Sequence, residues 1–434
     1  MKITAIKIIS QFFLLLAILF FTNSLALAES RNITIVYTGN LDGELEPCGC
    51  SEGGNKGGIK RRAQGIDELR AEDPNLFLFS SGGLLISEIA EDKLKSEYIL
   101  KGMTALDYDA IGVQWKDLAF GQRFLTEHNL PLVISNATNN NFKQTITSKK
   151  NNVEIAFFSW LNPTKNVQEK LALTETNNLK QTLAEAKNNN QLTVLATTYS
   201  LKTVKKKLPL DDVDILIIRS KYEYYGDPEV SDHMLVIQPG SRGMRLGKLN
   251  ITLDAKNKIT EWQHKVIPLP PEVKDAPRMQ AWYDEYNTRV KEDYEKATAL
   301  RQAQESGESP YAGTEACAGC HQKQHDIWQN TSHAEAFYTL QDNGKAFDPN
   351  CIICHSVGFK KPGGFLNATI TENLMHVQCE NCHGAAKSHA LSNGQTPVEN
   401  ADWPKEKMCA QCHVPKHSSE FDLEKYWPKI QHAN

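Results

Sequence analysis

The sequence predicts two domains of different fold class, an α/β domain followed by a mostly helical one. Short apolar runs typical of strands alternate with helix-type segments up to about residue 270. From Gly313 onward the strand signals vanish, and four C-x-x-C-H motifs follow one another between Cys317 and His413. The 434 residues are enough for two domains and a targeting segment.

In the first domain, strands are predicted where apolar residues form short runs bounded by turn residues. The expected strands are 32–37, 76–79, 153–158, 192–196, 213–218, 235–236 and 249–253. Helices are expected at 58–70 and 93–106. Buried strands alternating with helices predict layered sheets with helices packed on them.

Residues 1–28 are predicted to be a signal peptide. Lys2 and Lys7 precede the apolar run Phe12–Phe21, and Ala26-Leu27-Ala28 is a small-x-small cleavage pattern. An uncleaved anchor is the alternative. We expect export to the periplasm, cleavage after Ala28 and no further membrane span.

A helical linker is predicted between the two domains. Composition changes at Pro268–Pro271, and a charged, helix-prone stretch runs from Pro277 to about Glu305. The expected domains are therefore 29–270 and 313–434, joined by 271–312.

The four motifs share one spacing, which has a chemical reason. Two cysteines three positions apart lie on one helical turn and can form thioethers with the two vinyl groups of a porphyrin, while the adjacent histidine reaches the iron. Zinc ribbons also use C-x-x-C pairs, but they have no reason to place histidine after every pair. We therefore expect four covalent haems, held by Cys317, Cys320 and His321; Cys351, Cys354 and His355; Cys379, Cys382 and His383; and Cys409, Cys412 and His413.

A compact domain of about 120 residues has a radius of gyration of roughly 14 Å. Four porphyrins in that volume must nearly touch. The macrocycles are therefore expected to form much of the core, in an arrangement suited to electron hopping.

Three histidines outside the motifs are candidates for the second axial ligand. His333 lies twelve residues past His321, about 18 Å along a helix axis, so it must reach a different haem. His389, six residues past His383, faces the same limit. His432 lies near the chain end, where a specific contact would hold the terminus. A solvated histidine is the alternative for each. Weaker candidates are His325, His376 and His417, whereas Met375 and Met408 are expected to be packing residues.

Phrases from about Tyr311 to His432 resemble the tetrahaem cytochrome c-554 family. They are Glu315-Ala-Cys-Ala-Gly-Cys-His321, Ser332-His333-Ala, Val377-Gln-Cys-Glu-Asn-Cys-His-Gly384 with His389, and Phe421-Asp with Tyr426-Trp-Pro-Lys-Ile. The resemblance implies that most of the haems have two histidine ligands and that one iron is five-coordinate. By the same analogy, the open iron is that of the second motif, at His355.

Residues 31–270 resemble the 5′-nucleotidase branch of the calcineurin-like metallophosphoesterases in the order of their phrases. Thr38-Gly-Asn-Leu-Asp-Gly43 stands where that family has N-D-x-H-G, and Tyr108-Asp-Ala-Ile-Gly112 precedes its G-N-H-E position. The family's chemistry needs two divalent metals held by Asp, His and Asn. Those positions carry Asn40, Asp42, Ser80-Ser-Gly-Gly83, Trp115-Lys116, Thr198, Lys221 and Glu223 instead. We therefore expect the fold without the hydrolase.

Cys48 and Cys50 lie in the loop after the first predicted strand. A strained local disulfide or two buried thiols is one interpretation. A metal or redox site facing an open haem iron is the other, and would make both cysteines candidate catalytic residues. The sequence leaves these alternatives open.

Three functions are compatible with these features. The first is a periplasmic tetrahaem cytochrome that passes electrons between redox partners, another cytochrome among them. Residues 313–434 carry 10 Lys and Arg against 13 Asp and Glu, which favours a basic partner, and the overall net charge of −4 gives no reason to expect nucleic acid. The second is an oxidoreductase acting on a small nitrogen or sulfur compound at a five-coordinate haem. A phosphohydrolase is disfavoured by the missing ligands.

Overall fold

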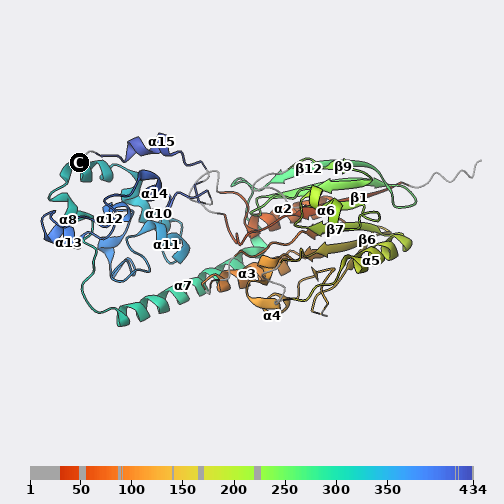
Figure 1. Cartoon of the computed structure of the whole chain (residues 1–434), viewed down its shortest axis with the longest axis horizontal. Helices are drawn as coiled ribbons and strands as arrows, with labels where there is room; N and C mark the ends of the chain where they lie inside the picture. Colours follow the sequence, from red (N-terminus) through yellow and green to blue (C-terminus); the bar gives the residue numbers. More distant parts are fainter. Residues whose placement is uncertain are drawn as a thin grey trace, which may run out of the picture. The chain divides into compact units, whose positions relative to one another are not determined.

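The computed structural model describes residues 30–47, 55–86, 89, 91–138, 141–164, 171–218, 226–415, 417–418 and 420–432. The predicted signal peptide lies outside these residues. The chain divides into two compact units, which Figure 1 traces in sequence colours. Unit 1 comprises residues 1–45 and 57–274, and unit 2 comprises residues 46–56 and 275–434.

Two six-stranded sheets form unit 1. The first has the order β12-β11-β1-β2-β3-β4 and the second the order β5-β6-β7-β8-β10-β9. The strands of the first are β1 (Arg31–Thr38), β2 (Phe77–Ser80), β3 (Ala110–Gly112), β4 (Leu132–Val133), β11 (Arg245–Leu253) and β12 (Ile259–Pro268). Those of the second are β5 (Ile146–Lys150), β6 (Val153–Trp160), β7 (Leu192–Thr197), β8 (Ile215–Ile217), β9 (Glu229–Ser231) and β10 (Met234–Ile237).

The core of unit 1 lies between the two sheets, because alternate residues of each strand point to the same side. Ile35 and Tyr37 of β1 share one apolar cluster with Phe79 of β2 and Phe157 of β6. A second cluster lies between the other face of the second sheet and the helices α5 (Thr176–Asn188) and α6 (Leu201–Lys207). The remaining helices are α2 (Ile59–Glu72), α3 (Asp92–Ala105) and α4 (Gly121–Thr126). The predicted α/β class is confirmed.

Unit 2 is helical, as predicted, and no strand forms among its described residues. Its longest helix is α7 (Gln280–Gln304). The others are α8 (Thr314–Ala318), α9 (Gln322–Gln329), α10 (Ala336–Asp342), α11 (Pro349–His355), α12 (Cys379–His383), α13 (Lys387–Leu391), α14 (Lys405–Cys409) and α15 (Leu423–Tyr426). Nowhere in the described parts of the chain is a helix long and apolar enough to cross a bilayer.

Helix α7, which the sequence suggested as a linker, packs on the motif-bearing segment and belongs to unit 2. The hydroxyl of Tyr294 donates to the carbonyl of Leu366 at 2.6 Å, and Arg301 donates to the carbonyl of Phe365 at 3.2 Å. Tyr294 also joins an apolar cluster with Phe337 and other residues of this unit. One face of α7 is therefore part of the unit 2 core.

Candidate haem centres and the cleft of unit 1

The C-x-x-C-H motifs lie on single helical turns, so the first cysteine and the histidine of a motif are brought together by backbone hydrogen bonds. The amide of His321 donates to the carbonyl of Cys317 at 2.8 Å, and that of His413 to Cys409 at 2.9 Å. At the start of α11, the Asp348 side chain accepts an amide of the first turn. The eight motif cysteines are free thiols and form no disulfides, which leaves their sulfur atoms available for thioethers.

Sulfur atoms from different motifs contact each other. Cys317 of the first motif and Cys379 of the third are hydrogen-bonded through their thiols, which lowers the pKa of Cys379 to about 6 and raises that of Cys317. Cys354 of the second motif and Cys412 of the fourth are joined in the same way, and this contact raises the pKa of Cys412. The attachment points therefore form two neighbouring pairs, motifs one and three and motifs two and four.

Six histidines form three facing pairs, and each pair joins a motif histidine to one of the three predicted distal candidates. The ring centres are 6.2 Å apart for His321 and His389, 6.2 Å for His413 and His333, and 5.9 Å for His383 and His432. With a metal–nitrogen bond of about 2 Å and about 1.1 Å from nitrogen to ring centre, imidazoles on opposite sides of one iron have centres about 6 Å apart. The spacing of all three pairs fits one iron each.

Hydrogen bonds and burial also prepare these imidazoles to bind a metal. Nδ1 of His389 donates to the carbonyl of Thr396 at 2.7 Å, and because a carbonyl can only accept, the lone pair remains on Nε2. Burial lowers the pKa values of His333, His383 and His413. These rings are therefore neutral near pH 7, the protonation state in which histidine binds iron.

His355, of the second motif, has a different environment. Across the described residues it faces no second histidine at the spacing of the other three pairs. Its Nδ1 donates to the carbonyl of Ala336 at 2.5 Å, which again directs the free lone pair to Nε2. The other three motif histidines each face a second imidazole, whereas this one faces none among the described residues.

Two of the weaker candidates, His376 and His325, face no second histidine among the described residues. His376 accepts the amide of Phe337 at its Nδ1, 3.2 Å away, and its ring meets the edge of Tyr338. His325 is buried beside Trp328, and neither of its ring nitrogens has a hydrogen-bond partner. Met375 is buried in the apolar cluster of unit 2.

Sequence reasoning missed the structural role of Glu380, the residue after Cys379. Its buried carboxylate accepts the backbone amides of Ala312, Gly313 and Ala386 at 2.8–3.1 Å. These bonds tie the third motif to the segment that leads into the first. An acidic residue inside a haem motif was the available signal, but its partners are distant in sequence.

Cys48 and Cys50 lie outside the described residues, so their proposed roles stay predictions. The nearby Glu46 is described and belongs to unit 2. Its carboxylate accepts from Lys345 Nζ at 2.7 Å and from the hydroxyl of Tyr283. Burial, followed by the nearby Glu46 charge, raises the pKa of Tyr283 to about 12.

Unit 1 has a polar cleft of about 300 Å³ at the ends of its strands. Asn40, Gln114, Lys116 and Thr198 line it, and these include positions where the sequence predicted lost metal ligands. Lys116 forms an ion pair with Asp42, whose other carboxylate oxygen accepts the amide of Arg242 at 3.0 Å. No cluster of three or more potential metal ligands occurs in the part of the chain that the structure describes. Lys221 and Glu223 fall outside that part.

Asp117, which sequence reasoning also missed, closes the loop beside this cleft. Its buried carboxylate accepts the amides of Gly83, Leu84, Leu85 and Gln114 at 2.5–3.0 Å. Burial raises the pKa of Asp117, and the amide bonds from Gln114, Leu85 and Gly83 oppose that rise. The acid therefore holds the loop that follows β2.

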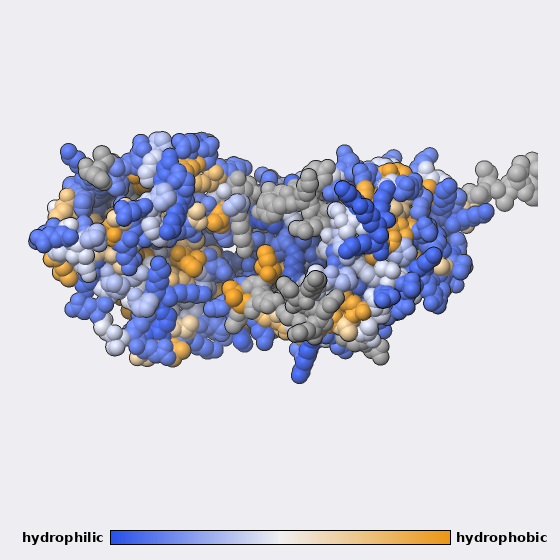
Figure 2. All heavy atoms as spheres, viewed as in Figure 1, coloured by the Kyte–Doolittle hydropathy of each residue, from blue (hydrophilic) through white to orange (hydrophobic). Residues whose placement is uncertain are grey.

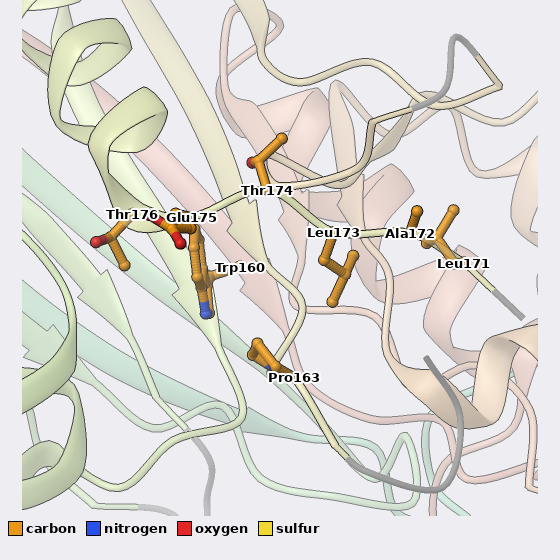
Figure 3. Close-up of a pocket in the computed structure, with 8 residues that line it drawn as sticks. All are labelled: Trp160, Pro163, Leu171, Ala172, Leu173, Thr174, Glu175 and Thr176. Atoms are coloured by element: carbon orange, nitrogen blue, oxygen red, sulfur yellow. The ribbon is translucent and has the colours of Figure 1, made fainter. Parts of the chain in front are cut away.

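A second hollow of unit 1, of about 590 Å³, is shown in Figure 3. Trp160 and Pro163 face Leu171 and Leu173 across it, and Glu175 is the one acidic residue among its described lining residues. Because its lining is mostly apolar, this hollow offers little chemistry.

Comparison with known proteins agrees with this division. Residues 316–384 match the family described as cytochrome c554 and c-prime. Cytochrome c-554 of Nitrosomonas europaea is 26% identical over 140 residues, which cover 25% of this chain and 60% of that protein. The chain thus spans less than two thirds of this relative's length.

The structure resembles two solved proteins of Thermus thermophilus. One is a 5′-nucleotidase precursor, with a TM-score of 0.53 and 14% identity over 80% of this chain and 74% of that one. The other is the sulfate thiohydrolase SoxB in complex with glycerol, with a TM-score of 0.51 and 12% identity over 59% of this chain and 60% of that one. At these identities the likeness shows the fold alone. The chain therefore joins a domain with the fold of the 5′-nucleotidases to a C-terminal segment that is similar to the cytochrome c554 and c-prime family.

Proposed function

We propose that this protein is a periplasmic electron carrier with four covalently bound haems. The observation that carries the proposal is the set of three facing imidazole pairs, each at the spacing of two ligands on one iron. The remaining motif histidine, His355 of the second motif, is oriented by a hydrogen bond from its Nδ1 to the carbonyl of Ala336. Haem c would supply an iron that alternates between the ferric and ferrous states.

The residues of unit 2 determine how electrons would pass. Two neutral imidazoles on one iron hold its geometry nearly constant during redox change, which suits electron transfer. The sulfur contacts Cys317–Cys379 and Cys354–Cys412 place the attachment points of two motifs side by side. Electron exchange between the two haems of each pair would then be short-range.

The partner that this surface would favour is a basic redox protein, such as another cytochrome. Residues 313–434 carry three more acidic than basic side chains before any haem propionates are counted, and such a charge steers a basic partner. On the face shown in Figure 2, hydrophobic residues gather in small groups among hydrophilic ones. Recognition by charge is therefore favoured over a large apolar interface.

Two measurements test the proposal. The mass of the purified protein should equal a chain that begins at Glu29 plus four haems. The oxidised protein should show low-spin signals from three haems and a high-spin signal from one. A number of haems other than four would contradict the motif assignment. Fewer than three low-spin haems would contradict the proposed imidazole pairs.

A second candidate is an oxidoreductase that acts on a small nitrogen or sulfur compound at the His355 haem. The observation that favours it is the single histidine at this motif among the described residues. Nitric oxide or carbon monoxide should then bind one haem per chain, and a substrate of this class should reoxidise or reduce that haem during turnover. Four low-spin haems inert to both gases would exclude this function.

A further inference from the structure

One peptide unit connects His355 to a second histidine, His376. The carbonyl of Ala336 accepts from Nδ1 of His355 at 2.5 Å. The amide of the same peptide unit, which belongs to Phe337, donates to Nδ1 of His376 at 3.2 Å. A continuous chain of hydrogen bonds therefore runs from the second-motif histidine through one peptide group to His376.

The position of this peptide unit explains why it needs His376. It lies in the first turn of α10, where backbone amides have no partner within the helix. The residue at the N-cap, Glu335, makes no side-chain capping bond. Phe337 is fully buried, so water cannot easily satisfy its amide. The imidazole of His376 takes the place of a cap.

The backbone of His376 shows the cost of this placement. Its φ is +74°, in the left-handed region that residues other than glycine rarely adopt. Histidine, asparagine and aspartate are the side chains that tolerate this region best. Strain of this kind persists where the surrounding structure requires it, and here the ring is also fixed by the edge of Tyr338, with centres 4.6 Å apart.

We propose that His376 is a positioning residue that tunes the proximal ligand of the second haem through the Ala336–Phe337 peptide. The inference rests on the proposed haem at the second motif. An acceptor on the amide side of a peptide polarises it and makes the carbonyl a stronger acceptor. A stronger bond from Nδ1 of His355 makes this imidazole a more electron-rich ligand, which stabilises ferric iron.

A second donor competes for the same carbonyl. The hydroxyl of Thr339 donates to the carbonyl of Ala336 at 2.7 Å. Removing this hydroxyl leaves the carbonyl to His355 and the backbone, and should therefore strengthen the bond to Nδ1. Substitutions at residues 376 and 339 are therefore expected to shift the midpoint potential of the second haem in opposite directions.

The test compares His376→Phe, His376→Asn and Thr339→Val in the full-length haem-loaded protein. The readouts are the midpoint potential of the high-spin haem and the iron–histidine stretching frequency of the reduced protein by resonance Raman spectroscopy. His376→Phe should raise the potential, with on the order of a tenfold change in the ferric–ferrous equilibrium, and lower the frequency. Asparagine, whose Oδ1 occupies the place of Nδ1, should restore both. Thr339→Val should shift both in the opposite direction.

The outcomes separate this inference from the proposed function. If wild-type protein gives no iron–histidine mode, the second haem is not five-coordinate and the proposed ligation fails. If the mode is present and neither His376→Phe nor Thr339→Val shifts it, the positioning role is wrong. If His376→Phe does not fold, Thr339→Val decides, and the low-spin spectra of the other haems report whether unit 2 is intact.

Discussion

The cleft of unit 1 and the imidazole pairs of unit 2 differ in how their polar side chains find partners. In the cleft, Asp42 is paired with Lys116, and Asn40 accepts from the side chain of Gln114 at 2.7 Å. In unit 2, paired rings such as His321 and His389 face each other at a distance that fits a metal between them. In the cleft the polar side chains bond to one another, whereas the paired imidazoles are spaced for a metal ion that the polypeptide itself does not contain.

The comparison indicates how a cleft on this fold can be stable without a bound metal ion. Metal ligands in an active site need a cation, because buried carboxylates without a partner are costly. Lys116 supplies a fixed positive charge beside Asp42, so this carboxylate has a partner without a bound metal ion. In the proposed function, unit 2 depends on its cofactor, because its paired histidines are spaced for iron.

The largest effect is expected from Glu380→Ala in unit 2. The buried carboxylate accepts three backbone amides, and its loss leaves them unsatisfied at a cost of about 3–5 kcal/mol. Unit 2 should lose its cooperative unfolding transition and bind less haem, while unit 1 keeps its own transition. Calorimetry with haem quantification measures both. Glu380→Gln keeps one acceptor and should be intermediate; wild-type stability in the Ala variant would contradict the role of these bonds.

The second-largest effect is expected from a substitution in one of the three facing imidazole pairs. His389→Ala removes the ring opposite His321, and should convert one low-spin haem to high-spin without loss of covalent haem, because Cys317 and Cys320 still hold it. Electron paramagnetic resonance measures the change. His233→Ala, at an exposed histidine of unit 1, serves as the control. An unchanged low-spin count in His389→Ala would show that this pair does not share an iron.

The sequence predicted those parts of the fold in which local pattern and tertiary burial agree. The apolar runs of β1, β6 and β7 are buried and were predicted. Strand β12 was not, because most of its side chains are exposed and its place is fixed by antiparallel pairing with β11, from Arg245 opposite Pro268 onward. A polar edge strand carries no apolar run for a sequence pattern to detect.

The candidate haem site likewise has parts that the sequence could predict and parts that it could not. The spacing of each motif predicted its thioether and proximal residues, because that chemistry is local. Which distal histidine faces which motif was not predictable, since His432 meets His383 across 49 positions of the chain. The roles of Glu380 and Asp117 depend on amides brought together by the fold, and residue type alone does not reveal them.

A smaller effect is expected from breaking an ion pair within unit 2, that of Lys345 and Glu46. Lys345→Met removes the ammonium that donates to Glu46 and to Asn287 at 2.7 and 2.9 Å, and should cost about 1–3 kcal/mol. Burial is the largest single influence on Lys345 and lowers its pKa, but Glu46 and Tyr283 together outweigh it and raise the pKa. Because the folded state then binds this proton more tightly, its stabilisation is fully present below the ordinary lysine pKa and is lost as pH rises through the higher pKa of the folded state. The difference between the denaturant midpoints of wild type and variant should therefore be smaller at about pH 11 than at about pH 8; a constant difference would contradict the ion pair.

The smallest effect should come from replacing the ion pair of the cleft as a unit. Lys116→Met alone leaves Asp42 without its cation and should destabilise unit 1 by about 1–3 kcal/mol. Asp42→Asn combined with Lys116→Met removes both charges, keeps an acceptor for the amide of Arg242, and should lie within about 1 kcal/mol of wild type. A double-mutant cycle on the unit 1 transition, with the haem spectrum as the internal control, measures the coupling. Additive single effects would mean that the two side chains do not compensate each other, and manganese-dependent nucleotidase activity in the wild-type protein would mean that the cleft has kept its chemistry.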